Sequence, residues 1–382
     1  MRIAFLVERP TQFEAPFYRF AARDPEHELR VIFLAADAAD PAFDPELSRP
    51  VDWGVDLLGG YPFRICPRRG RARFLAGELD ASRTDLLIVN GYTRLPYLLA
   101  NALARRRGIP TALRLDTAAF PPAGAPSARE RLRRVLFTRV LARAYDRFLG
   151  AGSLTLDYLR TCGVPRAKTG LFPYAVDVES FRERSRLSAE GRPALRARLG
   201  LPAAAPVVLA VAKLNSREAP WDLLAALPRV AREGTWTVVA GDGPERLALE
   251  SAAAERGLDR VRFLGYVPYP DLPALYAAAD LFVHAAREER WGVSVEEALA
   301  CGLPAIASSR VGAGYDLIEE GKNGFRYEAG DGAALARAID GALALPTSTV
   351  GETNRAILAR WDYAATWRGI VAAARGPAAG TA

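Results

Sequence analysis

Short apolar segments that alternate with helical patterns constrain this 382-residue chain more than any other feature. The apolar runs have the length and composition of buried strands. In chain order they are RIAFLV, ELRVIFLA, DLLIV, TALRL, DRFLGAG, PVVLAVAKL, TWTVVAG, VRFLG, DLFVHA and LPAIAS. Helical patterns lie between them, at about 93–107, 126–145, 153–162, 221–233, 243–257, 270–279, 294–301 and 312–320. Because this alternation produces parallel sheets covered on both faces, the sequence predicts an α/β fold.

The number of predicted elements indicates two domains. Residues 179–205 are charged, interrupted by Pro and Gly, and contain no strand-like run, so we place the linker there. The prediction is two Rossmann-like, doubly wound domains at 1–178 and 206–350, and a C-terminal helix within 351–382 that crosses back toward the N-terminal domain. Ligands of such sheets collect at the carboxyl ends of the strands, so the expected site is a cleft between the domains.

Composition excludes several classes of protein. Half of the residues are hydrophobic and 25% are charged, which is typical of a globular chain with large cores. The net charge is +7, but only three of the 51 basic residues are lysines, a skew that indicates a GC-rich bacterial genome rather than selection for nucleic-acid binding. Three cysteines without metal or disulfide spacing favour a reducing cytoplasm. We expect no membrane span and no signal peptide, and hence a cytoplasmic protein.

Two carboxylates with a glycine-containing loop between them form the most informative motif. Glu289 and Glu297 are separated by seven residues, and a helix is predicted to start near Ser294. Such a loop lets backbone amides approach a sugar or phosphate, and the helix N-terminus adds partial positive charge. The alternative is structural, because Ser294 and Glu297 also fit Ser-x-x-Glu, a capping box.

The stretch REERWGVSVEEALACGLPAIASS, residues 287–309, resembles the signature of the GT4 family of retaining glycosyltransferases. Glu288 and Glu296 have the same spacing, but Trp291-Gly292 after Glu289 decides the register. The resemblance implies a GT-B fold with two facing Rossmann-like domains. It also implies transfer of a sugar from a nucleoside diphosphate sugar to an acceptor that the sequence does not identify, with retention of configuration.

The resemblance also assigns roles to residues. Glu289 would position the donor sugar and Glu297 the ribose, while the loop amides of Gly292, Val293 and Ser294 would face the diphosphate. VLAVAKLNSREAPWDLLAAL at 208–227 implies that Lys213 holds the diphosphate. Where the family commonly has a second cation, five residues on, this chain has Glu218. Three interpretations stay open: Arg217 substitutes, the donor is bound differently, or catalysis has been lost.

Further matches complete the predicted site. VVAGDGPE at 238–245 contains Gly241, in a tight strand-to-helix turn where a structural role is favoured over a ligand contact. The backbone of Gly265, Tyr266 and Val267 corresponds to the family's contact with the nucleotide base. On the acceptor side, residues at the ends of predicted strands are candidates; they are Arg9, Gln12, Glu14, Tyr92 and His284, with Asp116 as a candidate catalytic contact.

No cofactor and no metal are expected, because neither histidine has a metal-ligand partner in the sequence and no Asp-x-Asp motif occurs. Residues 127–148 predict a basic amphipathic helix that either covers a sheet or lies on an anionic membrane. The predicted function is therefore a metal-independent glycosyltransferase. The alternatives are a catalytically silent sugar-nucleotide-binding partner protein and a peripheral membrane protein of glycan assembly; an epimerase or phosphorylase has less support.

Overall fold

The computed structural model describes residues 1–35, 42–44, 49–51, 53–120 and 128–375. Within these the chain forms two compact units. Unit 1 comprises residues 1–41, 56–176 and 363–382, and unit 2 comprises residues 42–55 and 177–362. Ser127, the first residue of the expected basic helix, and residues 376–382 of the expected C-terminal helix lie outside the described residues.

Unit 1 is built on a seven-stranded parallel sheet of order β5-β2-β1-β6-β7-β8-β9. Its strands are β1 (Arg2–Val7), β2 (Glu28–Phe33), β5 (Phe63–Ile65), β6 (Leu86–Asn90), β7 (Thr111–Leu115), β8 (Arg147–Gly150) and β9 (Thr169–Leu171). Its helices are α1 (Glu14–Ala21), α2 (Arg71–Glu78), α3 (Leu95–Arg106), α4 (Ala128–Leu136), the π-helical turn η1 (Phe137–Leu141), α5 (Ala142–Ala144), α6 (Ser153–Thr161), the short η2 (Arg166–Lys168) and α16 (Tyr363–Arg375). One hydrophobic core lies on each face of the sheet.

Unit 2 contains a six-stranded parallel sheet of order β12-β11-β10-β13-β14-β15. Its strands are β10 (Val207–Val211), β11 (Trp236–Ala240), β12 (Val261–Gly265), β13 (Leu281–His284), β14 (Ala305–Ser308) and β15 (Gly324–Tyr327), and the antiparallel pair β3 (Ala42–Asp44) and β4 (Arg49–Val51) is grouped with this unit. Its helices are α7 (Val178–Glu190), α8 (Arg192–Arg198), α9 (Pro220–Ala226), η3 (Leu227–Arg229), α10 (Arg246–Glu255), η4 (Tyr269–Asp271), α11 (Leu272–Ala278), α12 (Val293–Ala300), α13 (Ala313–Leu317), α14 (Gly332–Leu343) and α15 (Thr347–Leu358).

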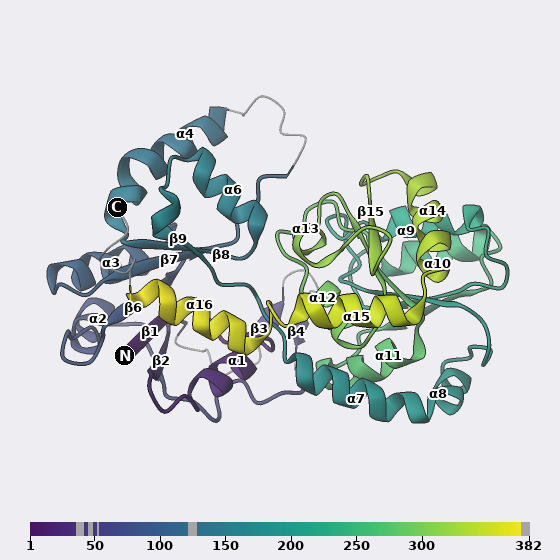
Figure 1. Ribbon diagram of the computed structural model, residues 1–382, viewed down its shortest axis with the longest axis horizontal. Coiled ribbons are helices and arrows are strands. Elements are labelled where there is room, and N and C mark those ends of the chain that lie inside the picture. The colour runs from purple at the N-terminus through teal and green to yellow at the C-terminus, as the bar shows by residue number, and fades with distance from the viewer. Residues whose placement is uncertain (36–41, 45–48, 52, 121–127, 376–382) are drawn as a thin grey trace. The chain divides into compact units, whose positions relative to one another are not determined.

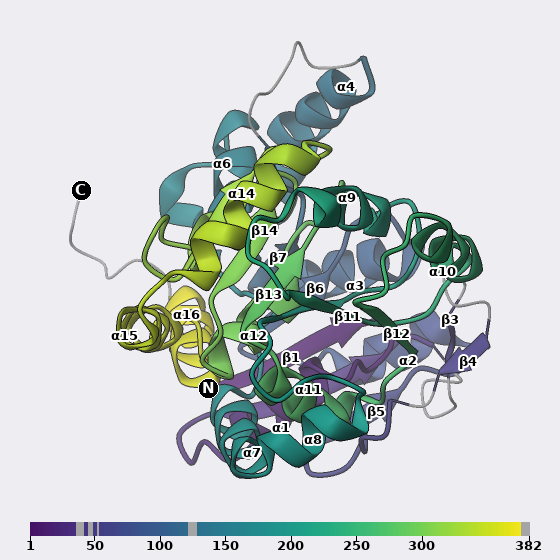
Figure 2. The same ribbon diagram turned by 90° about the vertical axis from the view of Figure 1, so that its right-hand side faces the viewer.

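Figure 2 shows α9 and α14 on one side of the unit 2 sheet and α7, α8 and α11 on the other. Both units have the 3-2-1-4-5-6 strand order of doubly wound sheets, so the predicted α/β class is confirmed. Every apolar run predicted as a strand is one. The strands that sequence patterns did not predict are short, such as β5 and β9 at the sheet edge of unit 1.

The segment 179–205 contains no strand, as predicted, but it is largely helical. α7 and α8 account for most of it, and both pack on α11 of unit 2. In unit 1, α16 is anchored by aromatic contacts of Phe17 with Tyr363 and Trp367, and Trp367 Nε1 donates to Asp24 Oδ2 at 2.6 Å. In the described part of the chain, no helix has the length and apolar character that crossing a membrane requires.

The basic helix differs from the sequence expectation in orientation. Phe137 and Leu141 are buried, while Leu132, Val135, Leu136 and Val140 are exposed by 70%, 55%, 39% and 51%. The apolar residues of this helix are therefore divided between core and solvent. The two buried residues lie within the π-helical turn η1, whereas three of the four exposed ones precede it. Figure 1 shows the helix on the unit 1 surface.

Candidate functional site

The site in unit 2 begins at the point where the strand order reverses. β10 and β13 are neighbours in the sheet, although 69 residues lie between the end of β10 at Val211 and the start of β13 at Leu281. The loop 212–219 leaves the carboxyl end of β10 and the loop 285–292 leaves that of β13. Doubly wound sheets bind ligands at this switch point. The topology therefore brings Lys213 and Arg217 to the same edge as His284 and Glu289.

The loop after β10 has a shape fixed by one side chain. Asn215 Oδ1 accepts hydrogen bonds from the backbone amides of Arg217 and Glu218, both at 3.0 Å. The loop ends at Ala219, which has a φ of 48° and is the one non-glycine residue with positive φ in the described parts of the chain. Such strain concentrates at functional sites, where the surrounding structure enforces it.

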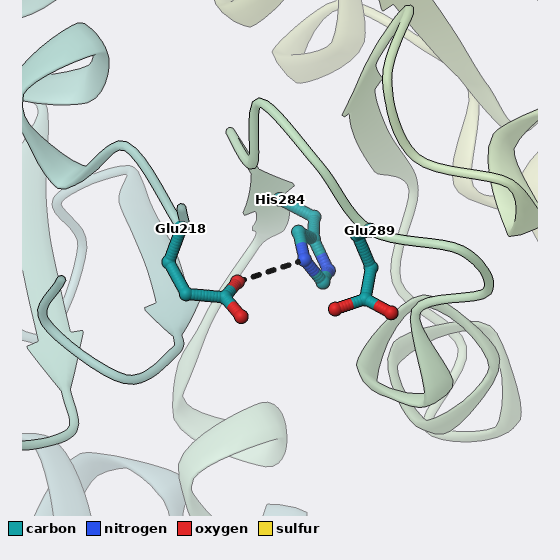
Figure 3. Close-up of side chains that lie close together, drawn as sticks. All are labelled: Glu218, His284 and Glu289. Carbon is teal, nitrogen blue, oxygen red and sulfur yellow. Dashed lines mark ion pairs between the residues drawn. The ribbon is translucent and has the colours of Figure 1, made fainter. Parts of the chain in front are cut away.

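Four side chains from the two loops and from the end of β13 form what we call the switch-point cluster: Arg217, Glu218, His284 and Glu289. The Arg217 guanidinium lies 2.7 Å from Glu218 Oε1 and 2.9 Å from Glu289 Oε2. The imidazole Nε2 of His284 lies 3.3 Å from Glu218 Oε2. Figure 3 shows the imidazole between the two carboxylates. Glu218 and His284 are buried, whereas Arg217 is 35% exposed.

The electrostatics of the cluster explain how a carboxylate occupies this place. Burial alone would raise the pKa of Glu218, but the close imidazole of His284, with the charges of Arg217 and Lys213, lowers it below its usual range. Burial alone would lower the pKa of His284, yet its pairing with Glu218 raises it. The two groups therefore stabilise each other's charged form, and Glu218 is not an isolated negative charge beside the predicted diphosphate position.

The ligand atoms of Glu218, His284 and Glu289 lie within 4.8 Å of one another, a spacing that would suit a metal ion. The Arg217 guanidinium, however, bridges both carboxylates. A cation at this position would have to displace that guanidinium, so we interpret the group as an ion-pair network.

The loop that carries Glu289 leads directly into α12. Gly292 has a φ of 104°, and a Cβ there would lie 2.9 Å from Val311 Cγ1, so the turn requires glycine. α12 begins at Val293, one residue from the predicted start. The capping-box alternative is wrong: Gly292 is the N-cap, without a side-chain cap, and the Ser294 hydroxyl pairs instead with His284 Nδ1 at 2.9 Å. The first turn of α12 is therefore tied to the switch-point cluster.

Glu297 lies on the inner face of α12. It is 4% exposed, and the hydroxyl of Tyr276 donates to its Oε2 at 2.8 Å. Burial raises the pKa of Glu297 to about 7, although hydrogen bonds from Tyr276 and Tyr269 oppose the shift. Tyr276 is not predicted as a site residue, because nothing in the sequence indicates that α11 packs beside this carboxylate. The predicted ribose contact stays a prediction.

The other predicted donor residues of unit 2 follow neighbouring strands. Gly241 follows β11, and a Cβ there would lie 1.8 Å from the carbonyl oxygen of Ala212, so its observed role is close approach of two loops. The Gly241 amide donates to Gly265 O at 2.8 Å. Tyr266 and Val267 are half-buried after β12, and Lys213 is half-buried after β10.

Unit 1 has a second polar group at its own switch point, between β1 and β6. Glu14 is buried at the start of α1 and pairs with Arg114 of β7, which is 2% exposed. The Arg114 guanidinium also stacks on Phe172 and Tyr174, at 3.8 Å and 4.2 Å from the ring centroids. The sequence patterns predict Glu14 as an acceptor contact but do not point to Arg114. The one signal for Arg114 is an arginine inside an apolar strand run.

The remaining acceptor-side candidates are more accessible. Asp116 Oδ2 accepts a hydrogen bond from the Tyr174 hydroxyl at 3.4 Å. Tyr92 packs edge-on against Phe137, with ring centroids 5.1 Å apart. Arg9 and Gln12 lie half-buried in the loop after β1. All five candidates from this half of the chain belong to unit 1, whereas His284 belongs to unit 2.

Comparison with known proteins covers both units. Residues 191–357 match the family model for glycosyl transferases group 1, and residues 19–175 match that for a glycosyl transferase 4-like domain. The chain is 31% identical over 279 residues to a 2-deoxystreptamine glucosyltransferase of Streptomyces kanamyceticus, covering 70% of each chain.

Two further matches agree with these. A GDP-mannose-dependent alpha-(1-6)-phosphatidylinositol monomannoside mannosyltransferase of Mycolicibacterium smegmatis is 31% identical over 192 residues, which span 48% of this chain and 49% of that enzyme. Among solved structures, Anabaena Alr3699/HepE in complex with UDP is similar with a TM-score of 0.74 and 18% identity, over 97% of this chain and 98% of that one. The structural likeness supports the fold.

Proposed function

The chain belongs to the GT4 family of glycosyltransferases with GT-B architecture, and we propose that it moves a sugar from a nucleoside diphosphate sugar to an acceptor hydroxyl with retention of configuration. The observation that carries this proposal is the convergence of Lys213, Arg217 and Glu289 at the switch point of unit 2. The curated relatives and the UDP-bound Anabaena structure support a nucleotide sugar as donor.

In the proposed reaction the bond from the sugar's anomeric carbon to the diphosphate breaks. A bond from the acceptor oxygen forms on the same face, and the acceptor's proton leaves with the diphosphate. Lys213 and the amides of Gly292 to Ser294 stabilise the departing charge, which is where preorganised electrostatics lower the barrier most. Arg217 shares its charge with two carboxylates, so its proposed role is to hold Glu289 in place against the donor sugar.

The pairing of Glu218 also favours an enzyme over a catalytically silent binding protein. Catalysis would be lost if this carboxylate repelled the diphosphate of the donor. Since Arg217 and His284 both pair with Glu218, that repulsion is largely compensated inside the cluster.

Calorimetric titration with UDP, GDP and dTDP tests the donor site. We expect one nucleotide to bind selectively, and Lys213→Ala to weaken it by about 10- to 100-fold, the effect of losing a charge-assisted hydrogen bond. Lys322→Ala is the matched control, because Lys322 is exposed on unit 2 and pairs there with Glu319 at 2.9 Å. Failure of all three nucleotides to bind, or equal affinity in the Lys213 and Lys322 variants, would overturn the proposal.

A second function, attachment to an anionic membrane surface, is favoured by α4 and η1. Leu132, Val135, Leu136 and Val140 are exposed there, and Arg131, Arg139 and Arg143 are exposed beside them. A helix that presents apolar and basic side chains together matches the interface of an anionic bilayer, where each basic residue contributes about 1 kcal/mol. The two functions are compatible in one protein.

Vesicle sedimentation tests this second function. We expect binding to vesicles rich in phosphatidylglycerol, loss of binding in high salt, and no binding to phosphatidylcholine alone. Leu132→Gln together with Val135→Gln should reduce binding. Leu247→Gln should not, because Leu247 is even more exposed, at 77%, but lies on α10 of unit 2, away from the basic helix. Sedimentation equal to that of the phosphatidylcholine control would contradict the proposal.

A further inference from the structure

The partners of His284 suggest a role that the family resemblance does not include. Its Nε2 lies 3.3 Å from Glu218, and its Nδ1 lies 2.9 Å from the hydroxyl of Ser294 in the first turn of α12. The imidazole is thus buried between the loop after β10 and the start of α12. Both segments belong to the proposed donor site.

The charges of the switch-point cluster depend on this imidazole. Glu218 and Glu289 contribute two negative charges and Arg217 one positive charge. The cluster is therefore negative when His284 is neutral and has no net charge when His284 is protonated. Because burial strengthens the interaction between charges, a diphosphate beside Lys213 would meet a different electrostatic potential in the two states.

We propose that the imidazolium of His284 supplies the positive charge that Glu218 removes from the donor site, so that nucleoside diphosphate binding is coupled to uptake of a proton at His284. His284 is in this view a positioning residue. The inference rests on the proposed function, since it assumes that the diphosphate binds at the unit 2 switch point.

The two ring nitrogens show that the coupling acts through charge. The Ser294 hydroxyl can accept from a protonated Nδ1 or donate to a neutral one, so its contact with the ring persists in both protonation states. Nε2 lies 3.3 Å from Glu218 at ion-pair distance, without hydrogen-bond geometry. Loss of the proton therefore removes the positive charge that compensates Glu218, while the ring keeps its place between the two segments.

The groups that face His284 favour the protonated form. Glu218, Glu289 and Glu297 all have charges that interact with the imidazole, and Arg217 opposes them. Burial alone would lower the pKa of His284, but Glu218 outweighs it and the pKa is raised from its ordinary value of 6.5. Nucleotide binding adds negative charge nearby and should raise that pKa further.

Nucleotide affinity as a function of pH is the first test. Between about pH 6 and pH 9 we expect the affinity of wild type for the nucleotide that binds to fall, by up to about tenfold per pH unit above the pKa of His284. His284→Gln should bind weakly with a flatter pH profile. His27→Gln is the matched control, since His27 is the other histidine of the chain and pairs with Asp24 in unit 1.

Direct observation of the proton is the second test. In His27→Gln the His284 ring is the sole histidine, so its NMR signal can be titrated without overlap, and we expect UDP or the preferred nucleotide to shift its midpoint upward. Glu218→Gln should lower that midpoint and strengthen nucleotide binding near pH 8, which keeps the inference testable if His284→Gln does not fold. Weaker binding by Glu218→Gln would overturn it.

The outcomes separate the two proposals. If no nucleotide binds at any pH, the proposed function fails. If a nucleotide binds with the same pH profile in wild type and in His284→Gln, or without moving the His284 midpoint, the proposed function stands and this inference fails.

Discussion

Gly312 holds the loop that carries Glu289, and Gly312→Ala should disturb both stability and the proposed chemistry. The Gly312 amide donates to Glu289 O at 2.9 Å, and the amide of Ala313 donates to Trp291 O at 2.7 Å. A Cβ at position 312 would lie 2.0 Å from the carbonyl oxygen of Arg290, whereas contacts under 3.0 Å are essentially absent for real Cβ atoms. The Arg290 peptide must therefore move by about 1 Å, because close-packed interiors transmit such a clash.

The expected cost follows from this displacement. Gly312 has a φ of −60°, which alanine adopts readily, so the clash and not the backbone conformation causes the loss. Overpacking of this kind costs about 1–3 kcal/mol of folding free energy. A misplacement of about 1 Å near reacting groups lowers the rate on the order of 100-fold. We expect Gly312→Ala to show both effects, together with weaker nucleotide binding.

Urea denaturation and the rate of donor hydrolysis or transfer measure these effects. Gly351→Ala is the control within unit 2: position 351 lies in α15, and its Cβ would approach only the flexible Nη1 of Arg355, at 3.4 Å. That variant should gain up to about 1 kcal/mol from helix propensity. If Gly312→Ala is as stable and as active as Gly351→Ala, the loop does not depend on this close approach and our reasoning is refuted.

Three other predictions concern buried charges. Because the pKa of Glu297 is raised from 4.5 to about 7, its ionisation opposes folding, and the free energy of unfolding should decline as the pH rises through this interval. Urea denaturation at several pH values should show a smaller decline for Glu297→Gln. The same decline in the variant and in wild type would contradict the raised pKa. Tyr276→Phe removes the hydrogen bond to Glu297 at 2.8 Å and should lower the free energy of unfolding by about 1–3 kcal/mol in the same assay. An unchanged free energy of unfolding at pH 8 would show that this hydrogen bond does not contribute. Arg114→Met leaves Glu14 buried without its cation and should destabilise unit 1 by about 3–5 kcal/mol. Adding Glu14→Gln should recover part of that loss. If the losses of the two single variants simply add in the double variant, the two side chains do not stabilise each other.

The sequence alone determined the fold class and the family. Ten apolar runs became strands because a parallel sheet needs continuous burial, which local composition records. The stretch 287–309 identified the family because its glycines and carboxylates are needed at fixed spacings along the chain. The start of α12 was predicted to within one residue for the same local reason.

The tertiary structure decided how charges are paired. Glu218 looked disabling in the sequence because, beside its neighbour Arg217, its second partner is distant there: His284 is 66 residues away and meets it because β10 and β13 are adjacent in the sheet. Packing on unit 1 decided which apolar side chains of the basic helix are buried, and the Ser294 hydroxyl pairs with His284 rather than with Glu297. Burial and ion pairing arise from contacts between segments distant along the chain, and no local pattern of residues specifies them.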